Sequence, residues 1–188
     1  MSKQELREWK VLRETELLDA SPFLKVSSQR LELPDGRIVD NFYQLAMPDF
    51  AAILAETEDG RIVILRCYRH GARRICLTVP GGHLAPGEAP LLAARRELLE
   101  ETGYAAAEWR PLGSFVTNAN HRCQTAYFFH ARGCRAVAAP NSGDLEETEI
   151  LLMSRAELIA AFRAGDFPFV SVVALFGLAF GTALAEGV

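Results

Sequence analysis

The sequence predicts an α/β fold, in which a mixed β-sheet carries helices on both of its faces. Apolar segments of strand-like composition are mixed along the chain with segments of helical periodicity, and this order favours that class. The chain has 188 residues, of which 49% are hydrophobic. That length suits one well-packed domain and is short for two. We therefore expect a main domain over residues 46–188, preceded by a layer of strands over residues 1–45.

The strands are predicted from alternation and from turn residues. Residues 22–32 and 37–46 alternate between apolar and polar side chains, and Pro34, Asp35 and Gly36 between them are typical of a hairpin turn. Further strands are expected over residues 50–56, 61–68, 75–79, 111–118, 124–132 and 149–153.

Two helices are predicted from their end signals. The central helix is expected to begin at Pro90 and to end at Gly103, because proline favours the first turn of a helix and glycine its end. A later helix is expected over residues 155–164, since Ser154 and Glu157 form a capping box at its start. One apolar stripe of the central helix consists of Leu91, Ala94 and Leu98. The opposite face of that helix is left for chemistry.

A third helix is predicted near the C-terminus. Residues 167–185 carry no charge, and this length approaches that of a membrane span. Proline, serine and glycine interrupt the segment, so a buried helix of about 16 residues from Val170 is expected. Gly177 and Gly181 lie one turn apart and would let a neighbouring backbone approach closely. Because the same spacing favours helix pairing in membranes, membrane attachment through this segment remains the alternative.

Net charge and cysteine content limit the kinds of partner and the location that we expect for the protein. The formal net charge is −4, which disfavours nucleic acid as a partner because that binding needs a basic face. The four cysteines show no CxxC spacing, and the N-terminus lacks the apolar region of a signal peptide. We therefore expect reduced thiols, a cytoplasmic location and no membrane partner.

Three acidic residues crowd the last turns of the central helix. Glu97, Glu100 and Glu101 lie where the helix carries partial negative charge, and basic residues are usual there. Glu97 and Glu101 are four residues apart and share a face. Like charges this close need a cation among them, and a hard divalent ion such as magnesium is the natural candidate. Acidic residues where basic residues are usual at the end of a helix indicate a functional site.

The spacing around these acids is specific. From Gly82, five residues lead to Glu88, seven more lead to residues 96–98, and residues 100–101 and Gly103 close the pattern. This pattern resembles the Nudix box, and residues 49–82 resemble the strands before the box in the ADP-ribose pyrophosphatase-like branch. The resemblance implies an α/β/α sandwich that hydrolyses nucleoside diphosphates linked to another group. It also implies a homodimer that the N-terminal strands help to build.

The same resemblance assigns roles to individual residues. Glu97 and Glu101 would bind Mg²⁺ or Mn²⁺ directly, and the backbone carbonyl of Gly81 would be a third ligand. Glu100 would be a further ligand or a proton acceptor, and Arg96 would hold a carboxylate in orientation through paired bonds. Another role is implied for Glu88, which would tie the loop to the helix or reach a second metal through water.

Two further groups of candidates lie outside the box. A glutamate of the loop over residues 139–147, either Glu146 or Glu147, is expected to bind metal or to activate water, with an ordinary solvated acidic loop as the alternative. Phosphate contacts are expected from basic residues near the box, since a guanidinium matches phosphate oxygens, with a solvated hairpin loop as the alternative. These candidates are Arg69, Arg73 and Arg74.

One departure bears on the substrate. The ADP-ribose branch usually carries a proline about 16 residues after the box, and residues 116–121 contain none. ADP-ribose is therefore in question as the substrate, while the hydrolytic core is unaffected. Asn118 and Asn120 could bind a sugar or base, but an Asx turn is the favoured interpretation. We expect a metal-dependent hydrolase of ADP-ribose or a nucleotide sugar, with a non-catalytic nucleotide-binding or sensor module as the alternative.

Overall fold

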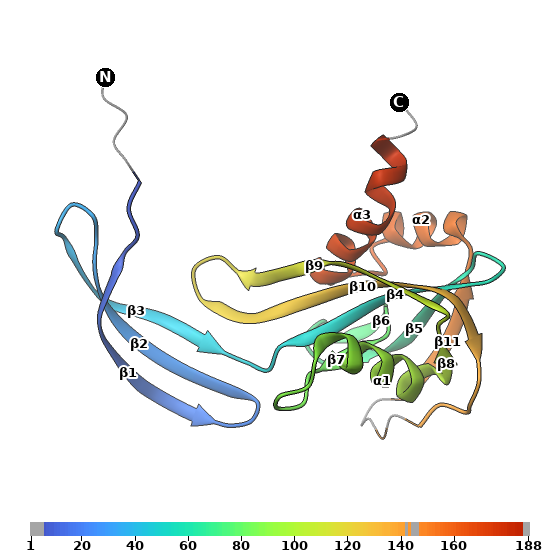
Figure 1. Ribbon diagram of the computed structural model, residues 1–188, viewed down its shortest axis with the longest axis horizontal. Helices are drawn as coiled ribbons and strands as arrows, with labels where there is room; N and C mark the ends of the chain where they lie inside the picture. The colour runs from blue at the N-terminus through green and yellow to red at the C-terminus, as the bar shows by residue number, and fades with distance from the viewer. Residues whose placement is uncertain (1–5, 142, 144–146, 186–188) are drawn as a thin grey trace. The chain divides into compact units, whose positions relative to one another are not determined.

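The computed structural model describes residues 6–141, 143 and 147–185. The chain divides into two compact units, each described here by itself (Figure 1). The first unit is Met1–Pro48 with Val116–Thr125, and the second is Asp49–Phe115 with Ala126–Val188.

The first unit is built on an antiparallel sheet in the order β1-β2-β3. Its strands are β1 (Lys10–Ala20), β2 (Leu24–Glu32) and β3 (Ile38–Ala46). The predicted hairpin between β2 and β3 is confirmed: the N–H of Gly36 donates to the carbonyl of Leu33 at 2.9 Å. Gly36 has φ of 83°, a left-handed conformation that glycine adopts without strain.

Strand β1 was not predicted, and its irregular pairing explains why. The register with β2 shifts between Val11 and Arg13 and again between Glu16 and Leu18. A bulge places an extra residue in one strand, so apolar residues no longer fall at every second position. Period-two alternation, on which the strand prediction depends, is therefore missing from this segment.

The second unit holds a mixed sheet in the order β10-β4-β5-β11. β10 runs parallel to β4, whereas β5 pairs antiparallel with β4, β6 and β11. The strands of this unit are β4 (Phe50–Thr57), β5 (Ile62–Arg69), β6 (Arg74–Thr78), β7 (Gly81–His83), β8 (Tyr104–Ala105), β9 (Glu108–Asn118), β10 (Arg122–Ala136) and β11 (Thr148–Met153). Two of them, β9 and β10, extend into the first unit. β7 and β8 were not predicted, because two or three residues are too few to show a period.

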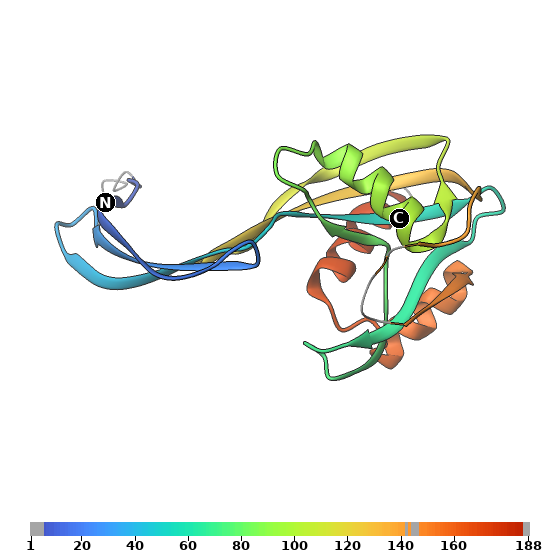
Figure 2. The same ribbon diagram turned by 90° about the horizontal axis from the view of Figure 1, so that it is seen from below.

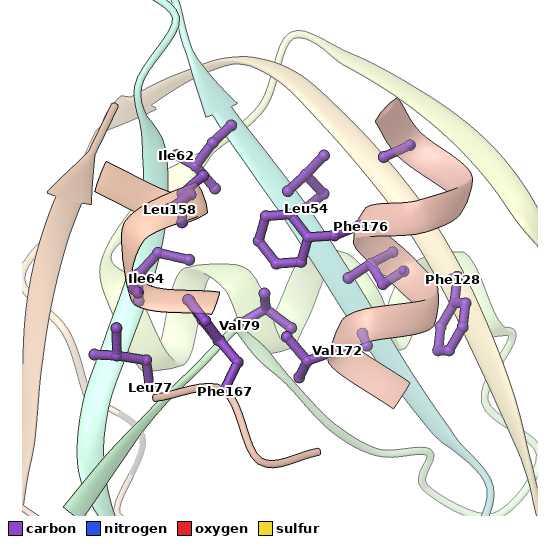
Figure 3. Close-up of a cluster of buried hydrophobic side chains, with 14 of the residues drawn as sticks. Leu54, Ile62, Ile64, Leu77, Val79, Phe128, Leu158, Phe167, Val172 and Phe176 are labelled. Carbon is purple, nitrogen blue, oxygen red and sulfur yellow. The ribbon is translucent and has the colours of Figure 1, made fainter. Parts of the chain in front are cut away.

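Helices cover both faces of this sheet, as predicted. The helices are α1 (Pro90–Thr102), α2 (Arg155–Ala164) and α3 (Val170–Ala185). Figure 2 shows α1, in green, on one side of the sheet and the orange and red α2 and α3 on the other. Ala51 and Ile53 of β4 pack with α1, whereas Ala52 and Leu54 pack with α2 and α3 (Figure 3). Because successive side chains of a strand point to opposite faces, β4 serves both cores and is apolar throughout.

The C-terminal helix is only half-buried, which corrects the expectation of a buried helix. Leu175 and Phe176 lie in the core, but Val170 is 84% exposed and Val173 49%. A side chain added at Gly177 would meet nothing within 4 Å, so the close backbone approach expected there is not found within the described chain. Among the described residues, no helix has the length and hydropathy to cross a membrane.

Candidate active site

Helix α1 carries the acids at its C-terminal end without a basic residue in its last turn. Pro90 occupies the first turn, and Gly103 ends the helix in a left-handed conformation with its N–H bonded to the carbonyl of Leu99 at 2.8 Å. Both ends of the predicted helix are therefore confirmed. The charge that offsets the acids comes instead from Arg96, which lies further back in the helix.

Arg96 contacts three of the predicted carboxylates. Its guanidinium donates to Glu88 at 2.9 and 3.0 Å, to Glu97 at 2.7 Å and to Glu100 at 3.0 Å. It also donates to the backbone carbonyl of His83 at 3.1 Å. We call Arg96, Glu88, Glu97 and Glu100 the Arg96 network. The sequence predicted one carboxylate held by Arg96, and the structure shows all three joined to it.

Glu88 joins the loop before α1 to the helix through hydrogen bonds. Its carboxylate accepts from the guanidinium of Arg96 and from the backbone N–H of Ala85 at 2.9 Å. These bonds, that of Arg96 first, lower the pKa of Glu88 to about 2. The loop is therefore fastened to the helix by a carboxylate that stays ionised at neutral pH.

Glu101 faces the glycine loop at β7. It is 8% exposed, and its Oε2 accepts a hydrogen bond from the backbone N–H of Gly81 at 2.7 Å. A Cβ at Gly81 would lie 2.2 Å from the carbonyl oxygen of Ala51, and a Cβ at Gly82 would lie 2.5 Å from the carboxylate of Glu97. Both glycines are required because backbone and carboxylates approach this closely. The structure thus brings Gly81, Glu97 and Glu101 together.

The carboxylates of Glu97 and Glu101 and the backbone carbonyl of Gly81 form a small set of oxygen donors, which suits a hard divalent ion. Within residues 6–141, 143 and 147–185, no group of three or more His, Cys, Asp or Glu side chains is placed to hold a metal. Arg96 donates to Glu97 and Glu100, and Glu101 accepts from the amide of Gly81. Two carboxylates and a backbone carbonyl remain compatible with Mg²⁺, which keeps several waters in protein sites. The donor chemistry therefore fits magnesium without a cage of three carboxylates.

The three predicted substrate arginines lie at the turn between β5 and β6. Arg69 shares a face of β5 with Val63, which packs in the core around α1. Arg73 closes the turn through its N–H to the carbonyl of Arg69 at 2.9 Å. Arg74 instead donates to the carbonyl of Gly165, at the end of α2, at 2.5 Å. The strand thus places Arg69 on the side of the sheet that carries α1, and Arg74 is bonded to the end of α2.

The loop after β10 is anchored to the end of α1. The backbone N–H of Asn141 donates to the carbonyl of Glu100 at 2.7 Å. Glu147 lines a cavity of about 570 Å³, and Glu146 lies outside the described residues. The other residues that line the cavity are Arg66, Cys67, Tyr68, Ile75, Thr148 and Glu149. The anchor at Asn141 was not predicted, since a backbone bond leaves no signal in side-chain pattern.

Comparisons with known proteins identify the family of the chain. A family model of the NUDIX domain matches residues 46–173. The chain is 29% identical over 137 residues to the methanol dehydrogenase activator of Bacillus methanolicus, a match covering 73% of this chain and 72% of that protein. It is 33% identical over 101 residues to the ADP-ribose pyrophosphatase of Bacillus subtilis (strain 168), a match covering 54% of each.

A solved structure supports the fold. The crystal structure of an ADP compounds hydrolase matches with a TM-score of 0.83 at 19% identity, and the match covers 98% of this chain and 99% of that one. The chain therefore belongs to the Nudix family, and the predicted resemblance to that family is confirmed. It is a pyrophosphohydrolase of that family.

Proposed function

We propose that the protein is a metal-dependent hydrolase of nucleoside diphosphates linked to another group. It cleaves the pyrophosphate bond to give a nucleoside monophosphate and a phosphorylated product. The observation that carries this proposal is the packing of the Glu97 and Glu101 carboxylates against the backbone of Gly81 and Gly82. Hard oxygen donors beside an exposed loop are suited to a diphosphate with its divalent cation.

Glu97, Glu101 and the carbonyl of Gly81 would hold Mg²⁺ or Mn²⁺. When bound, such an ion offsets the charge of the diphosphate and lowers the pKa of water. Arg96 fixes the orientation of Glu97 through a bond of 2.7 Å. A carboxylate held in this way can meet a substrate without first losing rotational freedom.

The proton acceptor is assigned to Glu100 or to a glutamate of the loop after β10. Glu100 has a side chain 41% exposed, so water can reach it, and one of its oxygens is held by Arg96 at 3.0 Å. Glu147 is the candidate from the loop, which the bond from Asn141 fastens to α1. Glu146 stays a candidate from sequence alone.

Phosphate binding is assigned to the turn between β5 and β6, with Arg69 as its main contributor. Arg69 shares the face of β5 that packs toward α1, and its guanidinium matches two phosphate oxygens. Arg73 lies in the same turn. The bond of Arg74 to Gly165 supports a lesser part for that residue in binding.

ADP-ribose and nucleotide sugars are the proposed substrate class. The similar protein of Bacillus subtilis is named an ADP-ribose pyrophosphatase, which supports ADP-ribose. Asn118 does not offer its side-chain oxygen to a ligand, because that oxygen accepts from the N–H groups of Asn120 and His121 at 3.0 and 2.8 Å. The predicted Asx turn is therefore confirmed.

A homodimer in the cytoplasm is part of this proposal. The described part of the N-terminal unit exposes large apolar side chains, among them Trp9 at 53%, Leu17 at 55% and Phe23 at 72%. Exposed apolar groups at this density are typical of a protein interface. Sedimentation at micromolar concentration should give twice the monomer mass of 20.7 kDa, and a monomer would contradict the dimer.

The test of the function is a substrate panel. Purified protein with magnesium is incubated with ADP-ribose, nucleotide sugars, dinucleoside polyphosphates and NADH, and nucleoside monophosphate is measured. We expect release from at least one member, and none after chelation with EDTA. Tight binding by calorimetry without cleavage of any member, at high enzyme concentration, would contradict the proposal.

A further inference from the structure

Two cysteines lie directly opposite each other on neighbouring strands. Cys67 of β5 is in register with Cys76 of β6 in an antiparallel pair, and both side chains are thiols. Opposite residues of such a pair share a face, with their Cα atoms about 4.5 or 5.5 Å apart. Both separations lie within the range that a disulfide spans. The two sulfurs can therefore be joined with little movement of the backbone.

The surroundings of the two thiols set the order in which they react. Both cysteines are 3% exposed, but Cys67 also lines the cavity beside Thr148. A small oxidant can thus approach Cys67 through that cavity. Burial, followed by the closeness of Cys67, raises the pKa of Cys76. Fewer Cys76 side chains are therefore thiolates at neutral pH, and this suits Cys76 to the second of the two steps by which a disulfide forms.

We propose that Cys67 and Cys76 form a dithiol site that an oxidant of the peroxide class closes into a disulfide. The Cys67 sulfur attacks one oxygen of hydrogen peroxide, breaks the O–O bond and becomes a sulfenic acid, while the departing hydroxide takes the thiol proton to form water. The Cys76 sulfur then attacks the Cys67 sulfur and expels hydroxide, which leaves as water with the Cys76 proton. Two thiols and one peroxide thus give one disulfide and two waters.

The disulfide restrains the hairpin that carries the proposed phosphate-binding residues. One register pair separates the two thiols from Arg69 and Arg74, which face each other at the turn. A cross-link between Cys67 and Cys76 closes a loop of about ten residues and limits the motion of that turn. Control of phosphate binding through this restraint rests on the proposed function, whereas the disulfide itself does not.

The test is peptide mapping of the whole protein after treatment with hydrogen peroxide. Trypsin cuts after Arg66, Arg69 and Arg74, so Cys67 and Cys76 leave on separate peptides that only a disulfide can join. We expect the joined peptides, their separation by dithiothreitol, and a melting temperature raised by about 5 °C over the reduced protein.

Two variants control for other cysteines. Cys134→Ala is the matched control, because Cys134 is also buried, at 2% exposure, and faces Thr57 rather than a cysteine. It should form the same joined peptides, whereas Cys76→Ala should lose both the link and the rise in melting temperature. A wild-type protein that shows only sulfinic acid on Cys67, or unchanged thiols, after exhaustive peroxide overturns the proposal. Because this measurement uses no substrate, it is independent of the proposed hydrolase activity.

Discussion

The carboxylate of Glu101 accepts a hydrogen bond from the backbone N–H of Gly81 at 2.7 Å, across 20 residues of sequence. This bond joins the C-terminal end of α1 to the loop at β7. It fixes a nearly buried carboxylate at the point where the backbone comes closest to the helix. Glu101 and the backbone of Gly81, two of the proposed metal ligands, meet at this junction of loop and helix.

Replacement of Glu101 by glutamine should remove activity and spare the fold. The amide oxygen can still accept from Gly81, but the charge for a cation is lost. We expect kcat to fall by about 100-fold or more, a loss typical of a preorganised charged group, with the melting temperature little changed. Steady-state kinetics and thermal unfolding measure the two effects. A fully active Glu101→Gln protein would show that the assignment of this residue is wrong.

Gly82→Ala should disturb the same junction through sterics alone. An added Cβ would lie 2.5 Å from the carboxylate of Glu97, so the carboxylate must move away from the loop. We expect a loss of activity of about 10-fold or more, since a displacement near 1 Å in such a site is costly. Gly177→Ala is the matched control, because its Cβ meets nothing within 4 Å. Equal activity of the two variants would contradict the close packing at Gly82.

Arg96→Lys should weaken both the fold and the reaction. A lysine ammonium cannot reproduce the fork that reaches Glu88, Glu97 and Glu100 together. We expect the free energy of unfolding in urea to fall by about 1–2 kcal/mol, and kcat to fall more than KM rises. If the lysine variant kept wild-type kcat, the Arg96 network would have no part in orienting Glu97.

The stability that Glu88 provides should depend on pH. Its pKa is lowered from 4.5 to about 2 in the folded protein, mainly by the hydrogen bond from Arg96. A carboxylate with a depressed folded pKa adds stability above its unfolded pKa and loses it as pH falls through the folded value. The difference in free energy of unfolding between wild type and Glu88→Gln should therefore be full above about pH 5 and shrink toward pH 2. A difference independent of pH would contradict the ionic role.

The sequence predicted the elements that carry strong local signals. Proline at the start and glycine at the end located α1, and the capping box of Ser154 with Glu157 located α2, where the N–H of Glu157 donates to the Ser154 hydroxyl at 3.3 Å. The apolar run of β4 predicted a strand because it serves two cores. These features depend on neighbouring residues, and such features can be inferred from a single chain.

Features that depend on contacts between distant parts of the chain could not be predicted from the sequence. Several charged residues lie near Arg96 in the sequence, and only the fold shows that its guanidinium bonds both Glu88 and Glu100. The anchor of Asn141 on Glu100 uses backbone atoms alone. The sequence predicted a buried α3, but one face of this helix is exposed. Composition gives the total apolar content of a helix and does not show which face another element covers.

The most direct measurement of the central claim is binding of Mn²⁺ to the protein, followed by electron paramagnetic resonance in the absence of substrate. The central claim is that Glu97 and Glu101, placed against Gly81, hold a divalent cation. We predict saturable binding to the wild-type chain and loss of that binding in the Glu97→Gln, Glu101→Gln double variant, with the Gly177→Ala protein unchanged. Equal binding by the double variant and the wild type would contradict the account.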